Sequence, residues 1–341
     1  MSATPLLEVD DLRCSFMTSH GEVRAVDGVS FTIGVGEALG VVGESGSGKT
    51  VTAMAVLQLF PITSRVRLSG RVVFEGVDLL RAGRRHLRQV RGGEVGVVFQ
   101  DPLTSLDPVM PVGDQIAEGI VLHKGVSRSI ARNRAIELLE RVGIPDAAAR
   151  SRDLPHRFSG GMRQRIMIAI AISCEPKLLI ADEATTALDA TVQAQILALL
   201  DDLRRESGMA TMVISHDIGV IAAVCDDAQV MYAGKIAERG PVRSILTDSA
   251  HPYTTALLQL VPRLDHRTHH RLRPIPGSPP LVAGDAVGCR FAPRCEHAMA
   301  QCAQTPPMVT VGDRHSSACW LSGDQRTPAE EIVRAQTKVA S

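Results

Sequence analysis

The sequence predicts an α/β protein built around a parallel sheet, and three patterns support this. Residues 38–60 form an apolar strand-like run, a glycine-rich turn and a helix-period segment. The apolar runs 177–182 and 210–217 flank the helix-period segment 191–207, and strand–helix–strand order implies parallel strands with a right-handed crossover. The first 40 or so residues alternate apolar and polar side chains between glycines, as short antiparallel strands do.

The sequence also suggests domain boundaries. The helical pattern around 102–158 predicts a helical subdomain inserted into the parallel-sheet core, and one further helix is expected over 244–261. A linker rich in Pro, Arg and His follows, and its histidines read as solvated linker residues: His266, His269 and His270. The expected domains are a nucleotide-binding domain at 1–250 with an antiparallel β subdomain, a small Cys-containing region at 251–321, and a disordered tail at 322–341.

Composition and charge exclude several classes of protein. Lys plus Arg and Asp plus Glu both total 37, so the formal net charge is zero and nucleic acid is not an expected partner. Aromatic residues make up only 3%, which argues against base-stacking surfaces. The N-terminal residues lack the basic and apolar runs of a signal peptide, and no apolar run is long enough to cross a membrane.

A glycine-rich segment after the first core strand predicts nucleotide binding. It fits the pattern GxxxxGK followed by Ser or Thr and consists of Gly43, Glu44, Ser45, Gly46, Ser47, Gly48, Lys49 and Thr50. Glycines let backbone N–H groups turn toward a phosphate, and the next helix directs its positive dipole end there. Lys49 supplies a charge to the β- and γ-phosphates of ATP, and the Thr50 hydroxyl is an expected Mg²⁺ ligand.

The segment 178–183 is an apolar strand that ends in two carboxylates. Asp182 is in a position to hold the Mg²⁺, directly or through water. Glu183 follows and is in a position to orient or deprotonate the attacking water.

Further motifs resemble those of ABC transporter ATPases. Phe158-Ser159-Gly160-Gly161-Met162 resembles their signature motif, usually LSGGQ, although Phe158 and Met162 replace the usual Leu and Gln. In the expected order, four other segments resemble the adenine-stacking aromatic, the Q-loop, the D-loop and the switch histidine: Phe16, Gln100, Ala187-Leu188-Asp189 and His216.

This resemblance implies an ABC-type P-loop ATPase fold and a shared site. It implies that Glu183, His216 and Gln100 take part in hydrolysis and that Gln100 joins Thr50 and Asp182 at Mg²⁺. It also implies a head-to-tail dimer in which Ser159, Gly160, Gly161 and Asp189 contact the nucleotide of a partner subunit. A Ser-Gly-Gly turn that opens a helix is itself an anion-binding terminus, which agrees with this role.

More specific segments resemble the oligopeptide/dipeptide/nickel importer family, in particular its D-type ATPase subunit. They lie at 101–108, 112–116, 158–165, 251–253, 275–280, 288–295 and 318–320. The resemblance implies an importer with a second ATPase subunit, usually a different chain, two membrane permeases and an extracytoplasmic substrate-binding protein. It places the chain peripherally on the cytoplasmic face of the cell membrane.

Three alternatives remain at this stage. The same machinery could import nickel, glutathione or opines. A soluble ABC ATPase acting on DNA or ribosomes would carry a coiled-coil insertion, a second fused ATPase domain or a basic face, none of which the sequence contains. A non-catalytic ATP or metal sensor would have lost Glu183 or His216, and both are present.

Four of the seven cysteines fall close together, in the last 53 residues: Cys289, Cys295, Cys302 and Cys319. They form no CxxC pair of the zinc-ribbon kind, and a reducing compartment disfavours disulfides. Four thiolates suit either Zn²⁺ or an iron–sulfur cluster. The long, irregular spacings and the resembling importer family favour a structural [4Fe–4S] cluster over zinc or unligated thiols. The other cysteines, Cys14, Cys174 and Cys225, are expected to be inert core thiols.

Overall fold

The structure is a computed structural model that describes residues 4–19, 21–61, 63–186, 188–260, 275–280 and 286–321. The linker histidines at 266, 269 and 270, Ala187 and the tail 322–341 lie outside the described residues. The strands are β1 (Leu7–Thr18), β2 (Gly21–Ile33), β3 (Ala38–Val42), β4 (Val66–Phe74), β5 (Val77–Asp78), β6 (Val95–Val98), β7 (Leu178–Asp182), β8 (Ala210–Ser215), β9 (Asp227–Tyr232), β10 (Lys235–Pro241), β11 (Val309–Gly312) and β12 (His315–Ser317). The α-helices are α1 (Lys49–Val56), α2 (Arg84–Gln89), α3 (Pro102–Ser105), α4 (Val112–Lys124), α5 (Arg128–Arg141), α6 (Ala147–Arg150), α7 (Gly160–Ile172), α8 (Ala190–Ser207), α9 (Ile218–Val224), α10 (Val242–Thr247) and α11 (Pro252–Leu258).

The chain forms two compact units. The first consists of residues 1–7, 32–38 and 73–214, and the second of residues 8–31, 39–72 and 215–341. None of the described helices is long and apolar enough to cross a membrane.

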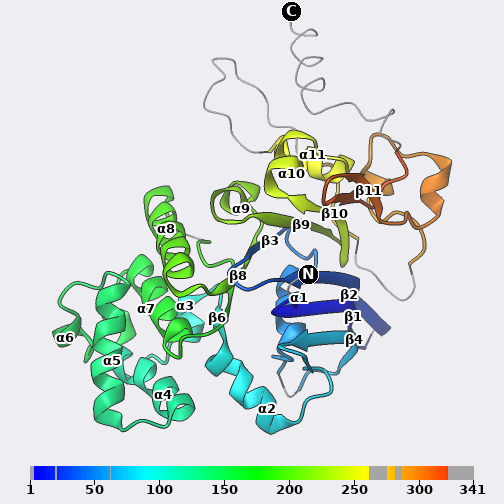
Figure 1. Ribbon diagram of the computed structural model, residues 1–341. Coiled ribbons are helices and arrows are strands. Elements are labelled where there is room, and N and C mark those ends of the chain that lie inside the picture. Colours follow the sequence, from blue (N-terminus) through cyan, green and yellow to red (C-terminus); the bar gives the residue numbers. More distant parts are fainter. Residues whose placement is uncertain are drawn as a thin grey trace, which may run out of the picture. The chain divides into compact units, whose positions relative to one another are not determined.

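The first unit combines parallel strands with the helical segment expected from the sequence. β6 and β8 both pair with β7 in parallel, and α8 lies between β7 and β8 in the chain, as the predicted crossover requires. Helices α4 and α5 lie side by side (Figure 1). Their apolar faces join α7 and α8 in one buried core that includes Ile116, Leu139, Ile166 and Ile196.

In the second unit, β2, β1 and β4 are neighbours in that order in one sheet, and a second, mixed sheet contains β3 and β9. β1 alternates buried and accessible residues along its first half, which agrees with the pattern in the sequence. In the mixed sheet β3 pairs with β9 in parallel, while β9, β10, β12 and β11 follow one another as antiparallel neighbours. The C-terminal region therefore extends the mixed sheet of this unit through β12.

One helix prediction was wrong in its extent. The run 244–261 covers the end of α10 and the whole of α11, and residues 248–251 separate the two helices. The backbone N–H groups of Ala250 and His251 donate to the buried carboxylate of Glu238, at 2.7 and 2.9 Å, rather than to helix carbonyls. Pro252, which has no N–H, then opens α11 at a position where a helix needs none.

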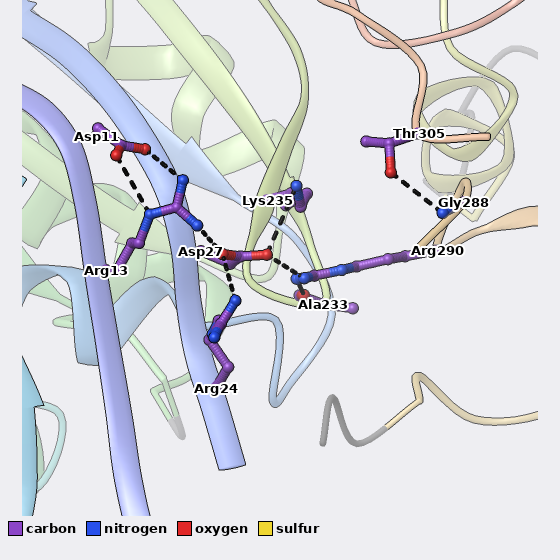
Figure 2. A network of polar contacts seen from close by, with 9 residues as sticks. All are labelled: Asp11, Arg13, Arg24, Asp27, Ala233, Lys235, Gly288, Arg290 and Thr305. Carbon is purple, nitrogen blue, oxygen red and sulfur yellow. Dashed lines mark hydrogen bonds and ion pairs between the residues drawn. The ribbon is translucent and has the colours of Figure 1, made fainter. Parts of the chain in front are cut away.

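A buried carboxylate joins the C-terminal region to β2 and β10 of the same unit (Figure 2). Asp27, 5% exposed, pairs with Arg13 at 2.7 Å, Arg24 at 3.3 Å, Lys235 at 3.5 Å and the buried Arg290. Burial alone would raise the pKa of Asp27, but the surrounding cations outweigh it and the pKa is lowered.

We expect Asp27→Asn to lower the free energy of unfolding by about 3 kcal/mol at pH 7, because it leaves Arg290 buried without its counter-ion. Because the folded-state pKa of Asp27 is depressed, its contribution is present above the unfolded pKa of about 3.9 and is lost as the pH falls below it. Urea unfolding at pH 7 and at about pH 3 measures this, with the exposed Asp10→Asn as control. An equal difference between wild type and Asp27→Asn at both pH values would contradict the assignment.

Candidate functional site

The glycine-rich segment 43–50 runs from the end of β3 into the first turn of α1, as the sequence predicts. Gly48 has a φ of 100°, and a Cβ there would lie 2.4 Å from the carbonyl oxygen of Ala25. A Cβ at Gly43 would lie 2.2 Å from the carbonyl oxygen of Met231. The backbone path of the loop therefore requires glycine at both positions.

The loop holds polar groups that suit a phosphate. The Lys49 side chain is buried, and its Nζ donates to the carbonyl oxygens of Gly43 at 2.7 Å and Glu44 at 2.9 Å. The Ser47 hydroxyl is buried and has no hydrogen-bond partner among the described residues. A buried ammonium turned inward and a buried hydroxyl without a partner are groups that a bound anion would satisfy. The residues present therefore fit the phosphates of ATP.

Three other predicted residues lie in the same unit as this loop. Thr50 is exposed in the first turn of α1. Phe16 lies half-buried on β1, with its ring centroid 5.9 Å from that of Phe60 in an edge-to-face arrangement. His216 is exposed directly after β8.

The first unit brings Gln100 and Glu183 together, although 83 residues separate them. Gln100 follows β6 and Glu183 follows β7, and these strands are parallel neighbours. Gln100 Nε2 donates to Glu183 Oε2 at 2.9 Å, and the Thr186 hydroxyl donates to the same oxygen at 3.1 Å. Asp182, 5% exposed, immediately precedes Glu183 and is the last residue of β7.

The backbone of Glu183 is unusual. Its φ of 48° lies in the left-handed region, which costs a non-glycine residue on the order of 1 kcal/mol. Its N–H nevertheless bonds to the carbonyl oxygen of Ile214 at 2.9 Å. Strained backbone at the end of a core strand directs the carboxylate toward Gln100 and Thr186. Sequence reasoning missed Thr186, whose position three residues after Glu183 was the available signal.

The segment 158–162 forms the N-terminus of α7. Ser159 caps the helix by accepting a hydrogen bond from the Met162 N–H at 3.3 Å, and Gly160 and Gly161 form the first turn. A Cβ at Gly160 would be 4.0 Å from Leu188, whereas at Gly161 it would be 2.7 Å from Val192. Phe158 is buried, and the Arg150 guanidinium lies 4.3 Å from its ring centroid.

Asp189 is the N-cap of α8. Its Oδ1 accepts a hydrogen bond from the Val192 N–H at 2.9 Å. Of the predicted D-loop, Leu188 and Asp189 are described, and Ala187 lies outside the described residues.

The four C-terminal cysteines converge on one cavity, which Phe291 and Trp320 also line. All four are free thiols of intermediate exposure: Cys289, Cys295, Cys302 and Cys319. Burial raises the pKa values of the Cys289 and Cys295 thiols. Within the described parts of the chain, however, no three His, Cys, Asp or Glu side chains lie close enough together to hold a metal ion. The predicted cluster is therefore not confirmed.

Two parts of the chain match known families. Residues 26–186 match the family described as ABC transporter, and residues 237–302 match the one described as oligopeptide/dipeptide transporter, C-terminal region. A putative peptide import ATP-binding protein of Brucella abortus is 50% identical, with 98% of each chain covered. The oligopeptide transport ATP-binding protein OppD of Salmonella typhimurium is 46% identical over 97% of this chain and 96% of its own.

The chain belongs to the ABC transporter ATP-binding family. Among the solved structures it resembles cbiO1 of Clostridium perfringens, part of the transporter complex cbiONQ, at 27% identity, with a TM-score of 0.60, over 71% of this chain and 90% of that chain. A dimeric ATP-binding cassette bound to ADP and phosphate aligns at 24% identity, with a TM-score of 0.62, over 70% of this chain and 99% of that chain, and shows the same fold. The resemblance and the ABC fold predicted from the sequence are confirmed. The chain is thus an ABC ATPase that uses ATP and Mg²⁺.

Proposed function

We propose that this ABC ATPase is the subunit that binds and hydrolyses ATP to energise an importer of dipeptides and oligopeptides. The observation that carries the proposal is the near full-length similarity to peptide import ATP-binding proteins, which includes the oligopeptide/dipeptide C-terminal region at 237–302. As sequence domains, we propose the boundaries 1–250, with the helical subdomain at about 102–158, and 251–321.

In the proposed site the loop at 43–50, the Mg²⁺ ligands and Glu183 have different roles. The loop at 43–50 binds the phosphates. The Lys49 ammonium then exchanges its hydrogen bonds to the loop carbonyl oxygens for contacts with the negative charge of the phosphates. Thr50, Asp182 and Gln100 hold the Mg²⁺, which neutralises charge on the phosphates when bound. Glu183 accepts the proton of the attacking water, and its oxygen is aligned by Gln100 and Thr186.

The remaining proposed roles are contacts to the nucleotide. Phe16 stacks on adenine, and His216 contacts the γ-phosphate. Ser159, Gly160, Gly161 and Asp189 contact the nucleotide bound by a second ATPase subunit, because the N-terminus of a helix such as α7 directs backbone N–H donors and a positive dipole end toward an anion.

The proposed partners follow from the importer function. They are a second ATPase chain, two permeases and an extracytoplasmic substrate-binding protein, with the chain peripheral on the cytoplasmic side of the cell membrane. The test is to co-purify the chain with its permeases, reconstitute the complex in vesicles and measure ATP turnover with the loaded binding protein. Dipeptides or oligopeptides should stimulate turnover. Stimulation by nickel, glutathione or opines alone would overturn the peptide assignment.

We also propose that the four cavity thiols hold a [4Fe–4S] cluster with a structural role. Its support is the convergence of all four side chains on one cavity and the suitability of four thiolates for iron–sulfur ligation. The thiols must approach one another to act as ligands, since no three of them form a ligand set in the described residues.

Purification without oxygen should therefore give a brown protein with broad absorption near ~400 nm and about four irons per chain. Cys295→Ser should remove the colour, while Cys225→Ser, which changes a thiol outside the cavity, should keep it. A colourless anaerobic preparation, with one zinc or with no metal, would rule the cluster out.

A further inference from the structure

The C-terminal region reaches the phosphate loop through an arginine. Arg294 donates two hydrogen bonds to the Glu44 carboxylate, from Nη1 to Oε2 at 2.6 Å and from Nη2 to Oε1 at 3.0 Å. The Arg294 side chain is 5% exposed and that of Glu44 is 24% exposed. This is a bidentate pair between the second residue of the loop and a residue 250 positions later.

Arg294 is itself held in place. Its Nε donates to the Pro276 carbonyl at 2.6 Å, Nη1 to the Tyr232 hydroxyl at 3.1 Å, and Nη2 to the carbonyls of Ile275 and Gly277, both at 3.3 Å. The Glu44 carboxylate raises the pKa of Arg294 further, so the guanidinium is charged throughout the physiological range.

The backbone of Glu44 is also held by hydrogen bonds. Its N–H donates to the Tyr253 hydroxyl at 2.8 Å, and its carbonyl accepts from Lys49 Nζ at 2.9 Å. Tyr253 is fully buried in α11. Residues of the C-terminal part of the chain therefore fix both the backbone and the side chain of one loop residue.

The same contacts continue to the cysteine cavity. Phe291 packs on Tyr232 and on Tyr253, with ring centroids 5.3 Å apart in both cases, and it lines the cavity with the four thiols. Phe291 and Arg294 lie in one short segment, which ends in the 3-10 turn Ala292–Arg294. The cavity, the aromatic cluster and the loop are thus connected by direct packing.

The charges of Glu44 and Arg294 should affect the affinity of the loop for ATP. A carboxylate within the loop repels a triphosphate unless a cation balances it, and the repulsion is strong where water is partly excluded. Arg294 supplies that balance in the structure. Without it, Glu44 would present an unpaired negative charge in the loop that binds the phosphates.

We propose that Arg294 is a positioning residue of the nucleotide site: it neutralises and orients Glu44, so that ATP affinity depends on the C-terminal region. The proposal rests on ATP binding at residues 43–50. It predicts a loss that is relieved when the carboxylate is also removed, which a purely structural role would not produce.

The experiment measures the dissociation constant of a fluorescent ATP analogue for the full chain. Arg294→Met should weaken binding about tenfold. Arg294→Lys keeps the cation but loses the two parallel hydrogen bonds, so it should weaken binding clearly less, by about threefold. The double variant Glu44→Gln, Arg294→Met should return to within about threefold of wild type. Arg314→Met is the matched control, because it breaks an exposed pair with Asp227 in the same region and should leave binding unchanged.

The results distinguish a failure of the proposed role of Arg294 from a failure of the proposed ATP-binding function. Wild-type affinity in Arg294→Met, or a double variant as weak as Arg294→Met, would overturn the role of Arg294. If Arg294→Met does not fold by circular dichroism, Arg294→Lys alone decides, since weakening as large as tenfold with the charge retained would contradict neutralisation. Failure of the wild-type chain to bind the analogue would instead contradict the proposed function.

Discussion

Replacement of Glu183 by Gln should reduce ATP turnover by about 10²–10⁴-fold, because a positioned general base contributes about 2.7–5.5 kcal/mol to the barrier. The amide keeps the shape of the carboxylate and can still accept hydrogen bonds from Gln100 and Thr186 through its oxygen. ATP binding should therefore be retained, and the ATP-bound form of the proposed ATPase pair should accumulate. Turnover is measured in the assembled transporter and binding in the isolated chain.

The control for this variant is Glu206→Gln, which removes an exposed carboxylate paired with Arg141 in the same unit. Exposed ion pairs contribute little to the free energy of folding, so Glu206→Gln should fold normally. Because Glu206 is not one of the predicted site residues, ATP turnover should be unchanged. Wild-type turnover in Glu183→Gln would remove Glu183 from the mechanism. A loss of ATP binding would instead assign the residue to nucleotide binding.

Local sequence patterns predicted much of this fold because each pattern has one main structural solution. The loop at 43–50 combines glycines at positions that exclude a Cβ with a strand before it and a helix after it, so residue types, spacing and context agree. The parallel pairing of β7 and β8 followed from two apolar runs separated by a helix-length segment. The order of β9, β10 and the C-terminal β11 and β12 did not follow, because pairing between distant strands leaves little local signal.

Polar contacts between residues far apart in the sequence also could not be predicted from local sequence patterns. The sequence indicated Gln100 and Glu183 only as members of two separate motifs. Their hydrogen bond depends on β6 and β7 being neighbouring strands, which the structure shows. Nothing local marks Glu44 as the partner of Arg294. The break between α10 and α11 depends on the buried carboxylate of Glu238, which competes for backbone N–H groups that the helical pattern had assigned to one helix.

Gly160→Asp should abolish productive closure of the proposed ATPase pair and reduce turnover by at least about 10²-fold, while the isolated chain binds ATP normally. The new carboxylate would lie at the N-terminus of α7, where the proposed partner phosphate binds, and like charges repel strongly in a closed interface. The fold should tolerate the change. A Cβ at 160 meets only Leu188, at 4.0 Å, and an acidic residue in the first turn suits the helix dipole.

Position 160 is the sharper choice because substitution at Gly161 confounds two effects. A side chain at 161 would start 2.7 Å from the Val192 side chain on α8, so Gly161→Asp should also lower the free energy of unfolding. Gly160→Asn has nearly the same shape without the charge and should lose much less turnover than Gly160→Asp in the assembled transporter. Equal losses in the two variants would show that bulk rather than charge matters. Loss of ATP binding by the isolated Gly160→Asp chain would contradict a site shared between subunits, because the phosphate loop at 43–50 would then depend on α7 of its own chain.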